Sequence, residues 1–420
     1  MNISILTAGS RGDVQPYVAL GVGLKHAGHV VRIPAPEVFR SLISQSGLDF
    51  VPTHSFSPQD FIKRRDIQEA VKQGNQIKVL GTLLKESGPM MESMLSEFWD
   101  ACQGADLIIT SGAFFVASEG AEKLGIPWLP ALLGPYSSTR EFPSPFLSNG
   151  PRLGGVYNRL THILFEQMIW QTGRSAVNLR RTKLGLSRIP FLGPFHNIRR
   201  QQIPHLLGFS PTVIPKPADW PDTHHITGYW FLDRPSDWQP PATLTKFLEA
   251  GPPPVCIGFG SMDTDNPERI SRIAIEALAL SGQRGILLTG WAGSGIKDLP
   301  DSIYQAVDLP HDWLFQHVVA VVHHGGAGTT AAGLRAGKPA IITPFGGDQF
   351  FWQTIVTQLG VGPLAPPFKR LTADKLGQII TTVVTNPTMQ AKAADIGSRI
   401  RAENGIGNAI DAIHQYAKWQ

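Results

Sequence analysis

Along much of this chain, short apolar runs typical of strands alternate with segments whose apolar residues recur at helical spacing. Short apolar runs, typical of buried strands, occur at residues 2–7, 30–36, 49–52, 106–110 and 126–133. Segments with helical periodicity lie between them, for example Tyr17–Ala27, with Pro16 in the first turn. This alternation predicts a parallel sheet with helices on both faces. Residues 1–205 are therefore expected to form a doubly wound α/β domain.

The alternation returns after a proline-dense stretch, residues 206–250, which we expect to be the interdomain linker. A second domain is predicted over residues 251–390. Its strands are expected at residues 255–259, 285–290, 307–310, 319–324 and 339–344. A chain of 420 residues is too long for one ordinary core, which agrees with two domains facing each other across a cleft. The last helices, in 391–420, are expected to pack back onto the first domain.

The first candidate for chemistry follows the apolar run 318–322. Two histidines lead from it into a glycine-rich turn and an alanine-rich segment that ends at Gly337, a pattern typical of strand, tight loop and helix N-terminus. Gly325, Gly326 and Gly328 let the backbone approach a ligand closely. A helix beginning near Gly328 would present free N–H groups and the positive end of its dipole to a phosphate. A tight helix entry without a ligand is the alternative.

The next predicted strand runs into PFGGDQ, which places Asp348 and Gln349 at the same edge of the sheet. Amides for a phosphate, together with a carboxylate and an amide side chain for hydroxyl groups, indicate a nucleotide sugar. The dinucleotide-binding pattern and the P-loop pattern are both absent from this stretch. Asp263-Thr264-Asp265 spells D-x-D, but its context is more typical of a loop and helix cap than of a metal site.

Composition is that of a globular protein, with 42% hydrophobic and 17% charged residues. The sequence holds no run of the roughly 18 apolar residues that span a bilayer and no secretory pattern, so a cytoplasmic protein is expected. Cys102 and Cys256 lie in different predicted domains, so neither a disulfide nor a cysteine-based zinc site is expected.

Charge is unevenly distributed. Up to His205 there are 21 basic against 15 acidic residues, and the remainder has 16 against 18. Seven basic residues fall within 174–200 with no acid among them: Arg174, Arg180, Arg181, Lys183, Arg188, Arg199 and Arg200. They are either a solvated face or a patch that contacts an anionic membrane surface. Nucleic acid is not an expected partner, because no nucleic-acid-binding motif accompanies the charge.

Four motifs carry a resemblance to a known family: GSRGDVQPYVALGVGLKHAGH (9–29), GFGSM (258–262), PHDWLFQH (310–317) and VVHHGGAGTTAAGLRAGKPAIITPFGGDQFFW (321–352). With them the chain resembles the family 1 glycosyltransferases of the GT-B fold, most closely the sterol 3-β-glucosyltransferases. The resemblance implies two Rossmann-like domains and transfer of glucose from UDP-glucose, with inversion, to a hydrophobic acceptor. No metal cofactor is expected, because the glycine-rich loop can hold the diphosphate and the sequence has no convincing metal cluster.

The resemblance also implies donor-binding residues. The diphosphate would be held by His324, by Ser261 and by the amides of Gly326, Gly328 and Thr329, and the sugar hydroxyls by Asp348 and Gln349. Plant relatives carry a tryptophan for the base where this chain has Asp308. Trp291 or Leu309 is therefore expected to cover the base, which leaves UDP and dTDP both open as the nucleotide.

Asp13 is the candidate catalytic base. Many relatives have a histidine at the matching place in the first loop, and this chain belongs to the subset with R-G-D. A carboxylate with an ordinary pKa near ~4 is a weak base, so burial beside a lipid-like acceptor is expected to raise it. A helix N-cap is the alternative role for Asp13, and the two are compatible.

The acceptor is expected to contact aromatic residues of the first domain, among them Phe114, Phe115, Tyr136, Phe142 and Phe146. A sterol is the first expectation, and another natural-product aglycone or diacylglycerol remains open. Two other functions remain as alternatives because fold alone does not determine chemistry: a nucleotide-sugar epimerase or phosphorylase, and a non-catalytic binding module.

Overall fold

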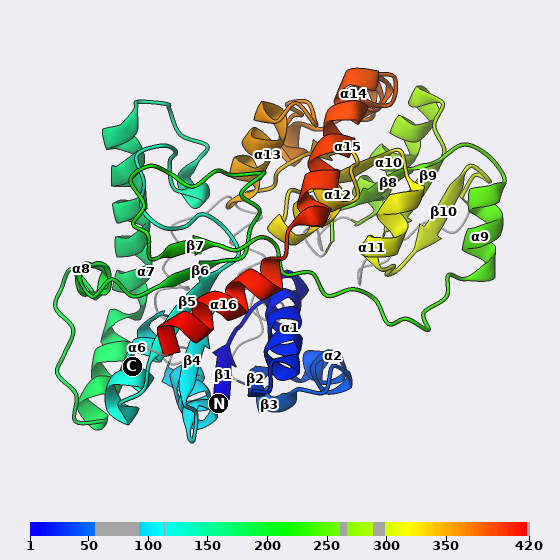
Figure 1. Ribbon diagram of the computed structural model, residues 1–420. Helices are drawn as coiled ribbons and strands as arrows, with labels where there is room; N and C mark the ends of the chain where they lie inside the picture. Colours follow the sequence, from blue (N-terminus) through cyan, green and yellow to red (C-terminus); the bar gives the residue numbers. More distant parts are fainter. Residues whose placement is uncertain (55–91, 113, 261–266, 289–298, 418–420) are drawn as a thin grey trace.

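The computed structural model of this chain describes residues 1–54, 92–112, 114–260, 267–288 and 299–417. Two parallel sheets stand side by side, each with helices on both faces (Figure 1). This confirms the expected architecture of two Rossmann-like doubly wound domains.

The first sheet has seven parallel strands in the order β3-β2-β1-β4-β5-β6-β7. They are β1 (Asn2–Leu6), β2 (Val30–Pro36), β3 (Asp49–Thr53), β4 (Leu107–Thr110), β5 (Trp128–Leu132), β6 (His205–Leu207) and β7 (His224–Ile226). The order reverses between β1 and β4, which makes the loops after these two strands the natural ligand crevice.

The second sheet has five parallel strands in the order β10-β9-β8-β11-β12 and reverses between β8 and β11. They are β8 (Val255–Gly258), β9 (Gly285–Leu288), β10 (Ile303–Ala306), β11 (Ala320–His323) and β12 (Ala340–Ile342). The prediction of a strand at residues 307–310 is wrong by four residues, because β10 begins at Ile303. Ile303 pairs with Gly285 and starts the ladder, while Val307 is already 61% exposed beyond its end.

Helices connect the strands. In the first domain and the chain that follows it they are α1 (Arg11–His26), η1 (Glu37–Phe39), α2 (Arg40–Gln45), residues 92–102, α6 (Phe114–Leu124), η2 (Pro145–Leu147), α7 (Gly155–Lys183), α8 (Phe195–Arg200) and α9 (Ala242–Glu249). In the second domain and beyond they are α10 (Pro267–Ser281), α11 (His311–Leu314), η4 (Phe315–His317), α12 (Ala327–Arg335), α13 (Gln349–Gln358), η5 (Phe368–Arg370), α14 (Ala373–Val384), α15 (Pro387–Ala402) and α16 (Gly405–Ala417).

Both faces of each sheet are buried because successive side chains on a strand point to opposite faces. Leu107 and Ile109 of β4 join the core beneath α1, whereas Ile108 joins the core beneath α6 and α7. In the second sheet, Val255 and Ile257 of β8 join the core on one face, whereas Cys256 between them joins the core on the other face.

The first domain extends beyond the expected boundary at His205. β6 and β7 lie within the stretch predicted as linker, but they pair with β5 and with each other. Each of these two strands is only three residues long and lies among prolines. The sequence therefore shows almost no periodic pattern of apolar residues there that would predict a strand. Leu244 of α9 packs into a core of the second domain, so the connecting segment is shorter than expected, about residues 227–241.

The last two helices divide between the domains. α15 packs on α12 so closely that a Cβ at Gly397 would lie 2.6 Å from Gly337 Cα. α16 crosses to the first domain and lies against α1, where Ala409 and Ile413 are buried in its core (Figure 1). Of the helices predicted to pack back on the first domain, α16 does so and α15 does not.

Candidate active site

Asp13 lies at the crevice of the first sheet, in the first turn of α1. This helix begins at Arg11, six residues before the predicted start, because Ser10 is the N-cap and Asp13 reaches back to it. Pro16 is therefore inside the helix. Asp13 Oδ2 accepts hydrogen bonds from the N–H and the O–H of Ser10, both 2.8 Å long. No described residue bonds to Oδ1, so that oxygen faces a ligand without competition.

Gly9 lets the Asp13 carboxylate sit against the loop. Its φ of +130° is unfavourable for other residues, and a Cβ there would lie 2.4 Å from Asp13 Oδ2. Asp13 is exposed to solvent, yet the protein around its carboxyl displaces part of its hydration. Loss of hydration raises the pKa of its carboxyl above the ordinary 3.8, and the two hydrogen bonds from Ser10 oppose this rise. The raised pKa makes Asp13 a stronger base.

The loop after β11 is the candidate anion site, at the crevice of the second sheet. Gly325 has a φ of +98°, and Gly326 is the extended N-cap of α12. Within the described chain, the amides of residues 326–329 donate to no acceptor. Gly328 is exposed, with no atom within 4 Å of where its Cβ would be. Free amides, a helix dipole and open space together match the requirements of a phosphate.

His324 lies beside these amides. Its Nδ1 is buried and has no hydrogen-bond partner among the described residues, and its Nε2 would be 2.6 Å from a Cβ on Gly326. Burial lowers the pKa of His324 to about 4, with a smaller contribution from His311. The ring is therefore neutral at physiological pH, and a neutral imidazole can donate one hydrogen bond.

His323 has a structural role. Its Nδ1 accepts a hydrogen bond from the Gly325 amide at 3.1 Å, and its side chain is fully buried. The ring is thus a neutral packing residue that shapes the turn.

Asp348 and Gln349 follow β12 and begin α13, as expected. Gln349 Oε1 accepts hydrogen bonds from the amides of Phe345 and Gly346, at 2.7 and 3.3 Å, and so fixes the loop. Asp348 Oδ2 accepts one from Trp352 Nε1 at 3.1 Å. Burial raises the pKa of the Asp348 carboxyl, and the negative charge of Asp13 adds to the rise. The two carboxylates therefore lie within electrostatic reach of each other.

Two contacts that the sequence did not reveal join the domains at this site. The hydroxyl of Tyr136, in the loop after β5, donates to Asp348 Oδ2 at 3.2 Å. Arg11, two residues before Asp13, forms an ion pair with Asp308 at 2.6 Å. Two features of the sequence could have signalled this ion pair. One is the R-G-D motif that contains Arg11, and the other is Asp308 at the place where plant relatives have a tryptophan. α1 also contacts α12 directly.

The remaining predicted site residues differ in their placement. Ser261 and Trp291 lie outside the described residues, as do the side chains of Phe114 and Phe115. Leu309 is 5% exposed and packs in a core with Leu244 and Phe315. Its side chain is therefore not placed to cover a nucleobase, contrary to the prediction from the sequence.

The other aromatic residues assigned to the acceptor pack on one another. Phe142 meets Phe351 of α13 edge-on at 5.4 Å, so it helps to seal the domain interface. Phe146 stacks on Phe165 at 4.4 Å and on Tyr136 at 5.3 Å, and remains 38% exposed. Of this group, Phe146 and Tyr136 have the positions best suited to meet an acceptor.

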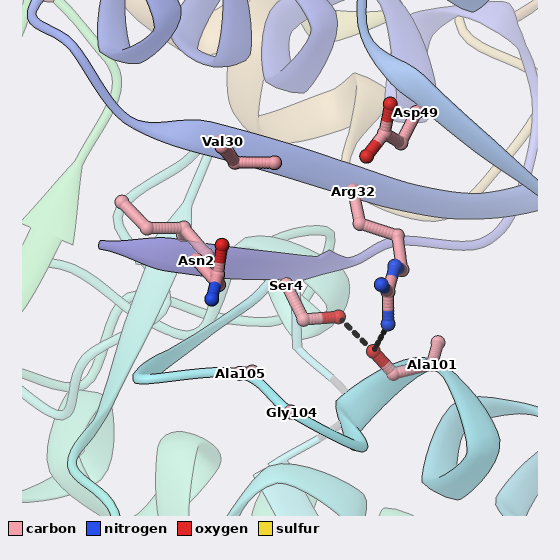
Figure 2. A pocket seen from close by; sticks show the side chains of 9 residues that line it. Asn2, Ser4, Val30, Arg32, Asp49, Ala101, Gly104 and Ala105 are labelled. Atoms are coloured by element: carbon pink, nitrogen blue, oxygen red, sulfur yellow. Dashed lines mark hydrogen bonds between the residues drawn. The ribbon is translucent and has the colours of Figure 1, made fainter.

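A hollow between the amino ends of β1, β2 and β3 is not this site. Figure 2 shows Ser4 and Arg32 pointing at the Ala101 carbonyl, to which both donate. Its volume of about 20 Å³ is enough for one water molecule. It also lies at the opposite edge of the sheet from Asp13.

The described ranges of the chain contain no group of three or more histidine, cysteine, aspartate or glutamate residues placed to hold a metal ion. Nor does any helix in them combine the length and hydropathy needed to cross a bilayer.

Four of the seven residues in the basic stretch are paired with acids from other parts of the fold. The pairs are Arg180–Glu119, Arg181–Glu122, Lys183–Glu92 and Arg199–Glu166. Arg174 lies over the Phe191 ring at 4.8 Å. Much of this charge is therefore paired inside the protein, which leaves fewer free cations in the stretch than its sequence suggests.

Comparison with known proteins agrees with this geometry. Residues 3–142 match the family model of the glycosyltransferase family 28 N-terminal domain, and residues 283–405 match that of the erythromycin biosynthesis protein CIII-like C-terminal domain. A sterol 3-beta-glucosyltransferase of Aspergillus fumigatus is 38% identical over 438 residues, covering 100% of this chain and 30% of that protein. The chain thus spans under a third of that relative's length.

Solved structures share the fold at low sequence identity. The glycosyltransferase of kitacinnamycin superposes with a TM-score of 0.72 at 20% identity, covering 99% of this chain and 98% of that one. The glycosyltransferase VinC in complex with DTDP gives 0.66 at 20% identity, with all of both chains covered. The two domain models match the two halves of the chain and the whole architecture agrees with the solved glycosyltransferases, so the chain has the GT-B fold.

Proposed function

We propose that this chain transfers glucose, with inversion, from UDP-glucose to the hydroxyl of a sterol or a sterol-like lipid. The observation that carries the proposal is the contact between α1, which bears Asp13, and α12, which begins at the phosphate-type loop. A base on one domain and an anion site on the other are what an inverting transfer needs. The similarity to sterol 3-beta-glucosyltransferases supports the acceptor class.

In the proposed reaction the acceptor oxygen attacks the anomeric carbon while the bond from that carbon to the diphosphate breaks. Asp13 Oδ1 takes the acceptor proton, and the departing UDP keeps the bonding electron pair. The amides of residues 326–329, the α12 dipole and the neutral His324 stabilise the charge that develops on the phosphate. Asp348 holds sugar hydroxyls through the oxygen that Tyr136 does not use. In this scheme no metal ion is required.

The test is direct. The purified chain, given UDP-glucose and a panel of sterols, other hydrophobic aglycones and diacylglycerol, is expected to form a sterol glucoside detectable by mass spectrometry, at an unchanged rate in EDTA. dTDP-glucose in a parallel reaction tests the choice of nucleotide. Loss of activity in EDTA with recovery in Mn²⁺ would rule out the metal-free scheme. Hydrolysis or epimerisation of UDP-glucose without any acceptor product would rule out the transferase.

Tyr136→Phe is expected to raise the KM for UDP-glucose by about tenfold, because one hydrogen bond to a charged carboxylate is lost. Affinity for UDP, measured by calorimetry, is expected to stay unchanged, since the nucleotide does not reach Asp348. Tyr229→Phe is the matched control, because the Tyr229 hydroxyl is buried without a hydrogen-bond partner. Equal effects of the two substitutions on KM would contradict the role of Tyr136.

We also propose that the chain contacts membranes peripherally, since a sterol acceptor resides there. Arg188 and Arg200 are the exposed residues of the basic stretch that retain no acidic partner within the described chain.

A further inference from the structure

The first half of α7 presents an apolar face that nothing in the described chain covers. Its members are spaced by three, four or one residues and so share one side of the helix. They are Val156, Leu160, Ile163, Leu164 and Met168, with Leu160 and Leu164 56% and 55% exposed. In Figure 1, α7 stands at the outer flank of the first domain, on the side away from the second sheet.

The apolar face continues onto a neighbouring loop. Phe191 and Leu192 are 60% and 71% exposed. Two glutamines on the same side of α7 hold this loop: Gln167 Nε2 donates to the Leu192 carbonyl at 2.8 Å, and Gln171 Nε2 donates to the Phe191 carbonyl at 2.9 Å. The helix face and the loop therefore make one surface, which we call the α7 face. An exposed apolar surface of this extent indicates a binding partner.

The charges around the α7 face select the partner. Between Glu141 and Asp219 the only acidic residue is Glu166, which pairs with Arg199 at 2.8 Å. Exposed basic side chains in the same region, with no acidic partner in the described ranges, are Arg152, Arg159, Arg188 and Arg200. An apolar face in a segment of chain that carries these unpaired cations fits an anionic lipid surface, whose headgroups meet the cations while its acyl chains receive the apolar groups.

We infer that the α7 face is a membrane-docking surface that inserts Leu160, Leu164 and Leu192 among anionic phospholipids. This rests on the proposed lipid acceptor and moves the membrane contact from the basic stretch to α7. The apolar contribution resists salt, whereas the contribution of the arginines falls as salt screens it. Docking would deliver the first domain, which carries Asp13, to the membrane that contains the acceptor.

The test uses the full chain and sedimentation with vesicles of equal parts phosphatidylcholine and phosphatidylserine. The double substitution Leu160→Gln with Leu164→Gln is expected to lower the vesicle-bound fraction by about tenfold or more, because two half-exposed leucines no longer insert. The matched control is Leu280→Gln with Leu364→Gln, two leucines 61% and 70% exposed on the second domain. The control is expected to bind as the unsubstituted chain does.

Replacing Arg159 and Arg188 by glutamine is expected to weaken binding to these vesicles and to reduce its salt dependence, with little change on pure phosphatidylcholine. Turnover of a sterol dispersed in detergent is expected to be the same in every variant, which separates this inference from the proposed function. Absence of turnover in detergent would count against the function alone. With turnover intact, the inference is overturned if the unsubstituted chain does not bind vesicles, or if the leucine pair binds as well as its control. It is also overturned if the chain is a dimer in solution that the leucine substitutions dissociate.

Discussion

Asp13→Asn is expected to lower turnover by roughly 10²–10⁴, the range of general-base catalysis, while leaving the UDP affinity and the melting temperature close to their original values. The amide oxygen of asparagine still accepts the hydrogen bonds from Ser10, so the start of α1 is preserved. What is lost is the ability to take a proton from the acceptor hydroxyl. Rates at saturating acceptor, together with calorimetry for UDP, measure both parts of this expectation.

The pH dependence gives an independent check. A base must be ionised to act, so kcat falls as the pH drops through the pKa of Asp13, which burial places above the ordinary 3.8. Ser10→Ala removes a hydrogen bond that lowers this pKa, so it is expected to move the acidic limb to higher pH with little effect on the rate at alkaline pH. A purely structural Asp13 would show no such movement.

Near-normal turnover of Asp13→Asn would mean that the base is elsewhere. His26 and His29 are poor substitutes, because they lie at the other end of α1. A helix rises about 1.5 Å per residue, which puts this end ~20 Å from Asp13. His29 also bonds to His414 of α16 at 2.8 Å. His54, at the end of β3, would then be the residue to test.

His324→Ala is expected to weaken UDP binding by about 10- to 100-fold, because a hydrogen bond to a charged phosphate is lost. Turnover is expected to fall by roughly 10²–10³, since the same group stabilises the departing diphosphate. Burial keeps the ring neutral, with a pKa of about 4, so its contribution is a hydrogen bond and not a fixed positive charge. His324→Gln retains an N–H donor and is expected to recover part of the lost affinity.

The matched control for this residue is His317→Ala, an exposed histidine of the same domain whose Nδ1 lies 2.9 Å from the Trp313 carbonyl. It is expected to bind UDP as the unsubstituted chain does. If a folded His324→Ala variant showed unchanged UDP affinity in calorimetry, the phosphate assignment would have to be abandoned.

The parts of the site that were predictable from the sequence are local. The glycines among residues 325–328 indicate a tight turn at their own positions, and the apolar run before them indicates β11. The start of the following helix was therefore predicted to within two residues of its N-cap, Gly326. Asp13, Asp348 and Gln349 were placed by the strands that precede them. Their place in the fold is confirmed, and their roles remain predictions.

What the sequence did not reveal depends on contacts between distant residues. The partnerships of Arg11 with Asp308 and of Tyr136 with Asp348 exist only because two domains meet, and no local periodicity encodes them. β6 and β7 were missed for a related reason: three residues gain strand geometry from the neighbouring strand, with little propensity of their own. The burial of Leu309 was hidden in the same way, because a leucine beside a motif can face either the ligand or the core.

The position of α16 bears on how the protein is made. Residues 405–417 complete the core of a domain whose first strand is at residues 2–6, so that core stays open until α16 has been synthesised. The second domain, continuous from β8 to α15, has all of its own elements earlier. On the ribosome, therefore, the half that is synthesised second is the first that can close its core, and the usual order in which domains mature from the amino end is reversed.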